Sequence, residues 1–88
     1  MISPEELREQ TNKARVNLLF SDAEMALTMI DLARVSQNAG LKQKRIDQAA
    51  KAYSFIRERI PTVSLTPPET IRLNDRMKLL KLRLALSS

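Results

Sequence analysis

The side chains able to do chemistry in this chain are carboxylates and cations, because none of its 88 residues is histidine or cysteine. It therefore lacks a side chain that exchanges protons near neutral pH, a thiolate nucleophile and a soft metal ligand. Its carboxylates do not follow the Glu and Glu-x-x-His pattern of di-metal bundles, and the one glycine, Gly40, cannot build a glycine-rich phosphate loop. We expect no enzymatic activity, no catalytic residue, no metal ion and no cofactor.

The basic residues are concentrated in the second half of the chain. Residues 1–39 carry four basic and six acidic side chains, whereas residues 40–88 carry eleven basic and four acidic ones, for net charges of −2 and +7. Lys42, Lys44 and Arg45 gather at the expected start of a helix, where free N–H groups and the macrodipole favour an anion. This pattern indicates a candidate anion site. The alternative is a solvated basic turn without a ligand.

The same half of the chain is a candidate for nucleic-acid binding. Arg72 and Arg76 join the three cations as possible phosphate contacts, as do Lys51, Lys78, Lys81 and Arg83. A sequence pI near 10.1 is typical of nucleic-acid-binding domains. However, the chain has only three aromatic residues for base stacking and none of the cysteines or histidines of a zinc site. Nucleic-acid binding is therefore the second interpretation, behind protein binding.

The elements that must position these groups are predicted to be helices. Ser3-Pro4-Glu5-Glu6 is a capping box that starts a helix at Pro4. Beyond it, small and apolar residues recur at spacings of three and four: Leu7, Thr11, Ala14 and Leu18, then Ala23, Ala26, Leu27, Ile30 and Ala33. The spacing slips near Phe20, where residues 21–24 repeat the capping pattern. The slip indicates two helices or one slightly bent helix, and the high helix propensity on both sides favours the continuous helix.

Two further helices follow. Gly40 is expected to close the first helix in a left-handed conformation, and Pro61 ends a second helix with an apolar stripe of Ile46, Ala49, Ala50, Tyr53, Ile56 and Ile60. Thr66-Pro67-Pro68-Glu69 starts a third helix, with Leu73, Met77, Leu80 and Leu84 on one face. The sequence therefore predicts one all-α domain over residues 1–88, an antiparallel bundle of three helices at about 4–38, 41–60 and 67–86.

Two apolar stripes exceed the needs of such a core. They consist of Val16, Phe20, Met25, Met29 and Leu32 in the first helix, and of Leu79, Leu82 and Leu86 in the last. Each is either the edge of a wide face wrapped by two neighbours or a surface for another chain. Met25 and Met29 would suit a partner groove, since methionine adapts to varied surfaces. The three leucines are candidates for self-association.

Residues 49–61 show a recurring helical pattern: small Ala49, aromatic Tyr53 four positions later, apolar Ile56 three positions after that, and a terminal Pro61. Over residues 23–61 the chain resembles a tetratricopeptide-like helical hairpin, and microtubule-interacting-and-trafficking-type domains look similar at this level. The resemblance implies a protein-binding scaffold without chemistry. It transfers no functional residue to this sequence.

The sequence as a whole predicts a non-enzymatic helical interaction module that binds a protein partner or a second copy of itself. The alternative function is binding of a nucleic-acid phosphate backbone through the basic C-terminal half. No uncharged stretch approaches the roughly 18 residues of a membrane span, and the first residues do not form a signal peptide. We therefore expect no membrane span and a cytoplasmic location.

Overall fold

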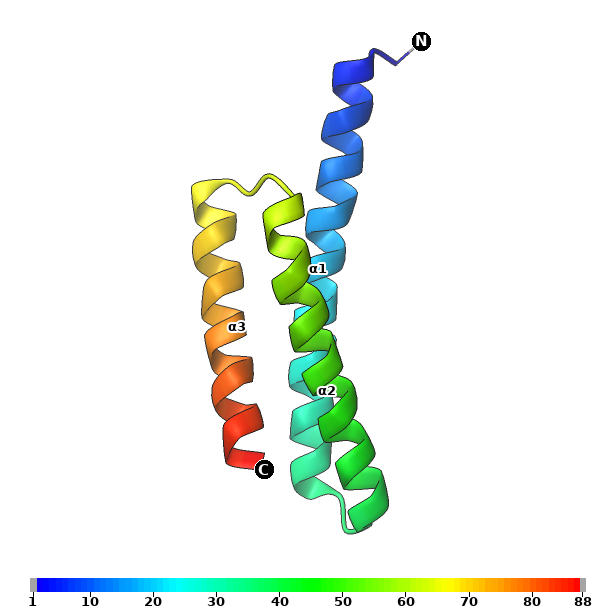
Figure 1. The fold of residues 1–88 in the computed structure, drawn as a ribbon, viewed down its shortest axis with the longest axis vertical. Coiled ribbons are helices and arrows are strands. Elements are labelled where there is room, and N and C mark those ends of the chain that lie inside the picture. The colour runs from blue at the N-terminus through cyan, green and yellow to red at the C-terminus, as the bar shows by residue number, and fades with distance from the viewer. Residues whose placement is uncertain (1, 88) are drawn as a thin grey trace.

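The fold is given by a computed structural model that describes residues 2–87. These residues form α1 (Pro4–Val35), α2 (Ala39–Arg59), the 3-10 turn η1 (Ile60–Thr62) and α3 (Pro67–Ser87), with no strand among them. Consecutive helices run in opposite directions and lie side by side (Figure 1). The predicted all-α, three-helix antiparallel bundle is confirmed.

Side-chain caps start the helices, as the sequence predicts for two of them. Ser3 Oγ accepts a hydrogen bond from the Glu6 N–H at 3.2 Å. At the start of α3 the capping box is reciprocal, because Glu69 N–H donates to Thr66 Oγ1 at 3.3 Å and Thr66 N–H donates to Glu69 Oε1 at 2.9 Å. These bonds satisfy backbone donors that the first helical turn leaves without partners.

The prediction for Gly40 is wrong. Gly40 does not have a positive φ and lies in the first turn of α2, while α1 ends at Val35. The residue that sets this boundary is Asn38, whose Oδ1 accepts from the Leu41 N–H at 2.9 Å with an extended backbone. An asparagine N-cap thus begins α2 two residues earlier than predicted, and α1 ends three residues earlier.

The helix α1 is continuous through Phe20, as the propensity argument favours, yet the predicted apolar stripe is wrong in its first half. Leu7, Thr11, Ala14 and Leu18 are all exposed. The core face of α1 begins instead at Val16 and continues through Leu19, Ala23, Ala26, Leu27, Ile30 and Ala33. The slip in spacing near Phe20 is therefore a change from one face of the helix to the opposite face, with no break in the backbone.

The core forms two adjoining clusters along α1. One joins Ile30 and its neighbours to Ile46 and Ala49 of α2 and Leu80 of α3; the other joins Leu19 and Ala23 to Ile56 of α2 and to Leu73 and Met77 of α3. Tyr53 is half-buried against both clusters. The predicted stripes of α2 and α3 are confirmed except at Ala50, which is exposed because it is rotated about 100° from buried Ala49.

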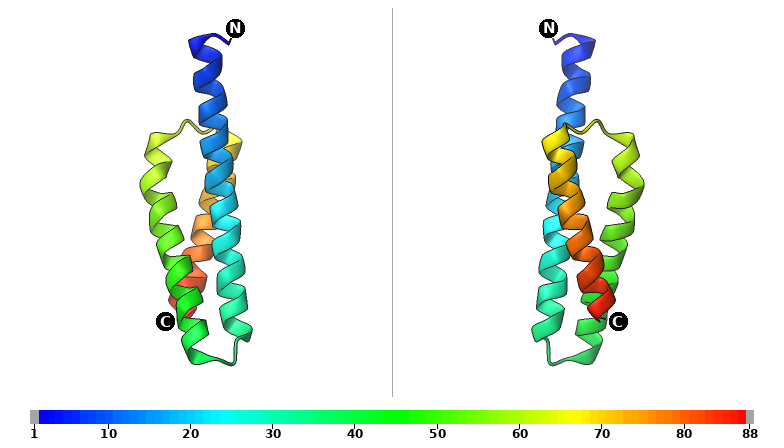
Figure 2. Two further views of the ribbon diagram at one scale, coloured as in Figure 1. Left: turned by 90° about the vertical axis from the view of Figure 1, so that its right-hand side faces the viewer. Right: turned by 90° about the vertical axis from the view of Figure 1, so that its left-hand side faces the viewer.

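The helix α1 is longer than its neighbours. Its first turns stand clear of α2 and α3 in both side views (Figure 2), and residues 4–11 are all exposed. The last tie to the bundle is Asn12, whose Nδ2 donates to the Ser64 carbonyl at 2.9 Å while its Oδ1 accepts from the Ser64 N–H at 2.7 Å. This pair of bonds fastens the connector between η1 and α3 to α1.

Ile56 provides a test of the core. Its side chain is fully buried between α1 and α3, so Ile56→Ala should lower the free energy of unfolding by about 2–4 kcal/mol through lost transfer energy and the cavity left behind. The matched control is Ile71→Ala, because Ile71 is 63% exposed and should change stability by no more than about 0.5 kcal/mol. Urea melts followed by circular dichroism measure both. Equal losses in the two variants would mean that this face of α2 is wrongly placed.

Glu69 provides a test of the α3 cap. The Thr66 backbone N–H, and then the Thr66 hydroxyl, hold the pKa of the Glu69 carboxyl below its ordinary value. Because the folded-state pKa lies below the unfolded one, the contact stabilises the fold above the ordinary glutamate pKa, and this stabilisation is lost as the pH falls through the folded value. A carboxyl NMR titration should therefore show a lowered Glu69 pKa, and Thr66→Val should move that pKa upward. A Glu69 pKa at or above the ordinary value in the wild type would contradict the cap.

Candidate interaction surface

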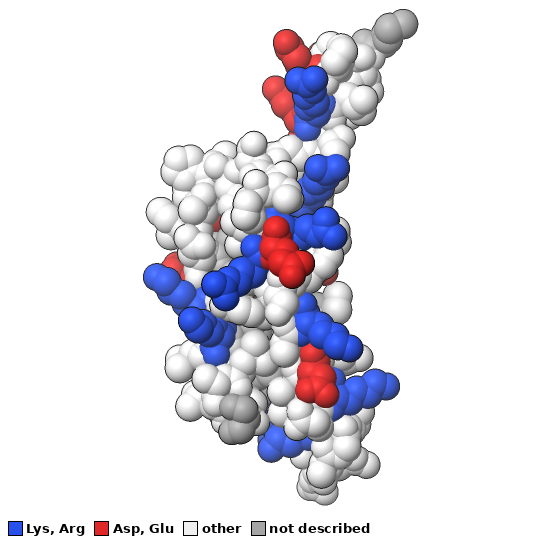
Figure 3. All heavy atoms as spheres, viewed as in Figure 1, with Lys and Arg blue, Asp and Glu red and all other residues white. Residues whose placement is uncertain are grey.

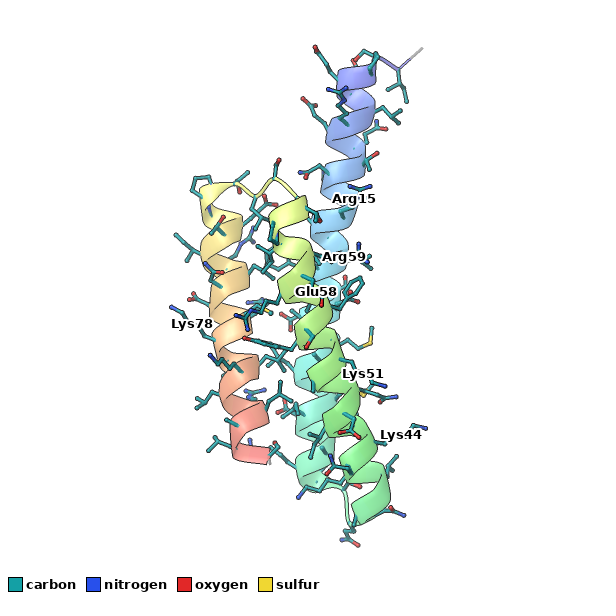
Figure 4. All side chains as sticks on the ribbon, in the orientation of Figure 1. Arg15, Lys44, Lys51, Glu58, Arg59 and Lys78 are labelled. Carbon is teal, nitrogen blue, oxygen red and sulfur yellow. The ribbon has the colours of Figure 1, made fainter. Side chains whose placement is uncertain are left out.

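The cations predicted to share an anion site lie on different sides of α2. Arg45 Nη1 donates to the Leu32 carbonyl of α1 at 3.5 Å. Lys42 lines a hollow of about 350 Å³ at the end of the bundle, together with Arg34 and Arg83, whereas Lys44 lies on the outer side of α2 (Figure 4). Residues two apart on a helix are rotated about 200° from one another, so these three side chains do not converge.

The candidate phosphate contacts of α3 are directed at α1. Arg76 is paired with Glu24, and the Arg72 guanidinium lies over the Phe20 ring at 5.6 Å from its centroid. Arg83, another predicted phosphate contact, donates to Asp31 Oδ1 at 3.0 Å. Arg76 and Arg83 thus neutralise acidic side chains of α1, and all three cations hold α3 against α1.

A different set of cations shares one face of the molecule. Lys44, Lys51 and Arg59 of α2 lie along this face with Arg15 of α1 and Lys78 of α3, and Glu58 lies among them (Figure 4). In the space-filling view basic side chains outnumber acidic ones over α2 (Figure 3). We call Arg15, Lys44, Lys51, Arg59 and Lys78 the basic face. Lys44, Lys51 and Lys78 belong to the predicted nucleic-acid contacts, whereas Arg15 and Arg59 do not.

The residues predicted to meet a partner divide into three groups. Met25 is 55% exposed on α1, whereas Met29 is half-buried against the core. Leu79, Leu82 and Leu86 are exposed on α3, and Leu79 also lines a shallow groove between α3 and α1. Of the remaining members of the first predicted stripe, Val16 is a core residue, Phe20 is half-buried and Leu32 is exposed.

The structure shows one long uncharged stripe on the outside of α1. Counting alternately four and three residues from Leu7 gives nine positions, and all nine are exposed. We call them the outer seam: Leu7, Thr11, Ala14, Leu18, Ser21, Met25, Thr28, Leu32 and Val35. The seam takes in every exposed large apolar side chain of α1. The helix carries ten charged residues in its 32 positions, and none of them falls in the seam.

The spacing of the outer seam is that of a helix–helix interface. An alternating four–three repeat keeps one face of a helix turned toward a partner helix over many turns. The seam runs from residue 7 to residue 35, a rise of about 42 Å at 1.5 Å per residue, on the side of α1 opposite the core. Sequence reasoning missed it because the first four positions were assigned to the core, although the repeat runs without interruption through the apparent slip near Phe20.

A hollow borders the outer seam on the side of α2. It has a volume of about 300 Å³ and is lined mainly by Leu18, Leu19, Phe55 and Val63, with Arg15 and Arg59 at its edge. The Arg59 guanidinium lies over the Phe55 ring at 4.8 Å from its centroid. The seam therefore adjoins an apolar patch flanked by two cations that have no carboxylate partner among the described residues.

No three acidic side chains in residues 2–87 come together where they could hold a metal ion. None of the three helices of that range combines the length and the apolar character of a membrane span.

No protein-family model, curated protein or solved structure matches this chain. The resemblance of residues 23–61 to a tetratricopeptide-like hairpin therefore stays a prediction. Within this range, Ala49 is fully buried in the cluster that joins α1 and α2.

Proposed function

We propose that the protein is a non-enzymatic interaction module whose outer seam binds another protein helix. The observation that supports this proposal most strongly is the nine-position seam without a charge, exposed over the whole length of α1. The seam exposes five large apolar side chains, and a row of such side chains in water is a liability unless a partner covers it. A helix with a four–three repeat fits a partner helix or a helix-binding groove. The exposed leucines of α3 are fewer and lie on another helix, although Leu79 lines one groove with Thr28 of the seam.

Photocrosslinking in cells tests this function. We expect benzoylphenylalanine at position 25, within the outer seam, to form an adduct with a protein, and the adduct should survive nuclease treatment. The matched control is position 48, because Gln48 is exposed on α2 outside the seam, and it should give no such adduct. A probe at position 82 tests the α3 leucines separately. Adducts at 82 but not at 25 would place the interface on α3, and an adduct at 25 that nuclease removes would contradict the proposal.

A second candidate function is binding of a nucleic-acid phosphate backbone, which the basic face favours. Its lysines and arginines lie on one side of the molecule (Figures 3 and 4), in contrast to the predicted residues Arg72 and Arg76, which are engaged with α1. If this face binds duplex DNA, the affinity should fall steeply between about 50 and 200 mM salt as counterions are released.

Fluorescence anisotropy with a labelled duplex checks this candidate. The variant Lys44→Gln/Lys51→Gln/Arg59→Gln should reduce the log–log salt slope by about 0.9 for each cation that contacts phosphate. The control Lys42→Gln/Arg45→Gln/Arg72→Gln makes the same change in net charge away from this face and should keep most of the slope. Equal effects of the two variants, or no binding at low salt, would leave the basic face as solvated surface.

A further inference from the structure

We infer that the helix covering the outer seam is α1 of a second copy of the chain, running antiparallel to the first. This inference rests on the proposed function of the seam and names its partner. It follows from three observations about α1: the sizes of the seam residues, the charges that flank the seam, and the turns that extend beyond the bundle. A pair of this kind has twofold symmetry, so each contact away from the axis occurs twice.

The side chains of the seam are complementary in size to the same seam reversed. When two antiparallel copies are aligned so that Leu18 of one lies opposite Ser21 of the other, the next layer brings Ala14 opposite Met25. The layer beyond pairs Thr11 with Thr28, and the last pairs Leu7 with Leu32. The two central layers therefore combine a large side chain with a small one, which is how facing helices interdigitate without voids.

The charges beside the seam favour the antiparallel orientation. In a heptad description the flank nearer α2 carries Arg8, Arg15, Asp22 and Met29, so it is basic in its first half and acidic in its second. Reversing one helix brings this flank against itself, and Arg15 of each copy then lies beside Asp22 of the other. In a parallel pair, the flank nearer α2 of one copy would instead meet the flank nearer α3 of the other copy. No oppositely charged residues would then face each other.

The same charges select the register. Moving one copy by a heptad in one direction would bring Asp22 opposite Asp22 and Glu24 opposite Glu24 across the twofold axis. Moving it by a heptad in the other direction would bring Arg15 opposite Arg15; it would also pair Arg8 with Asp22, but it would shorten the overlap of the two helices by seven residues. Like charges directly opposed are destabilising, so the alignment that pairs Leu18 with Ser21 is favoured over both neighbours.

The groups needed for this contact are available in the single chain. Neither Arg15 nor Asp22 forms an ion pair within the described residues, whereas Glu24 and Asp31, on the flank nearer α3, are already paired with Arg76 and Arg83. Arg59 lines the same hollow as Arg15 and Leu18, which adds a second cation near the position of the incoming Asp22.

The first turns of α1, residues 4–11, extend beyond the bundle and form an overhang. In this arrangement the overhang also acquires a partner. Residues 4–14 of one copy lie along residues 25–35 of the other, which places exposed Leu7 against exposed Leu32 twice in the pair. A 32-residue helix on a bundle whose other helices have 21 residues is thereby supported along its whole length.

Sedimentation equilibrium of the purified protein is the first test. We expect a dimer at roughly 10–100 µM, the range in which a micromolar association is populated. Met25→Lys should give a monomer with an unchanged circular dichroism spectrum, while the control Gln48→Lys, with the same added charge outside the seam, should leave the dimer intact. A wild type that is monomeric throughout this range would overturn the inference, and so would a dimer that Met25→Lys does not weaken.

Charge exchange tests the orientation and register. Arg15→Glu and Asp22→Arg should each weaken the dimer by roughly five- to thirtyfold, because two attractive contacts become repulsive. The double variant Arg15→Glu/Asp22→Arg should restore most of the affinity, since the opposite charges meet again. If the double variant loses as much dimer affinity as the two single variants combined, the proposed contact between Arg15 and Asp22 is contradicted.

Disulfide trapping reports the orientation directly, because the chain has no natural cysteine. Chains carrying Ala14→Cys and chains carrying Met25→Cys, mixed in equal amounts and oxidised, should form mainly mixed disulfides. Preferential joining of like chains would indicate a parallel pair and overturn the inference. If these tests fail but the photocrosslinker at position 25 forms an adduct with a different protein, only the second copy is excluded as the partner. If no seam position forms an adduct with any protein, the proposed function itself is disproved.

Discussion

The close approach of α2 and α3 to α1 is the constraint on which the rest of the structure depends. It is made possible by small side chains, since Ala23, Ala26, Ala33 and Ala49 are at most 1% exposed. Larger residues such as Ile30, Ile56 and Leu80 fill the space beside them. Because protein interiors pack densely, this arrangement leaves little freedom in the rotation of α1 about its axis. The rotation in turn determines which residues of α1 face outward.

Charge contributes to the same arrangement. The acidic character of α1 and the basic character of α3 meet in the pairs Glu24–Arg76 and Asp31–Arg83. Ion pairs that are this exposed to solvent stabilise a fold only modestly. They do, however, engage Arg76 and Arg83, which are therefore not free to bind a ligand. The excess of positive charge that remains lies over α2, where few carboxylates oppose it (Figure 3).

Local signals in the sequence were sufficient for the helices and their caps. Ser3, Thr66 and Pro61 act through neighbours a few residues away, so their roles could be predicted. Other features depend on tertiary contacts that spacing does not encode. A four–three repeat reports that Leu7 and Leu18 share a face, without reporting whether that face is inside or outside. The Asn12–Ser64 bonds join residues 52 positions apart, and Gly40 was assigned to the end of one helix because the cap formed by Asn38 was not recognised.

The Asn12–Ser64 bonds divide α1 into two segments of different cooperativity. Residues after Asn12 are part of the bundle and unfold with it, whereas the preceding two turns are held only by their own backbone bonds and the Ser3 cap. A helical segment of that length is marginal by itself in water. The helix–coil equilibrium of these two turns therefore depends on what packs against them. If a ligand requires the turns to be helical, the free energy of ordering them reduces the binding free energy of that ligand. The length of the overhang thus sets an entropic term by which binding strength can be tuned without a change in the core.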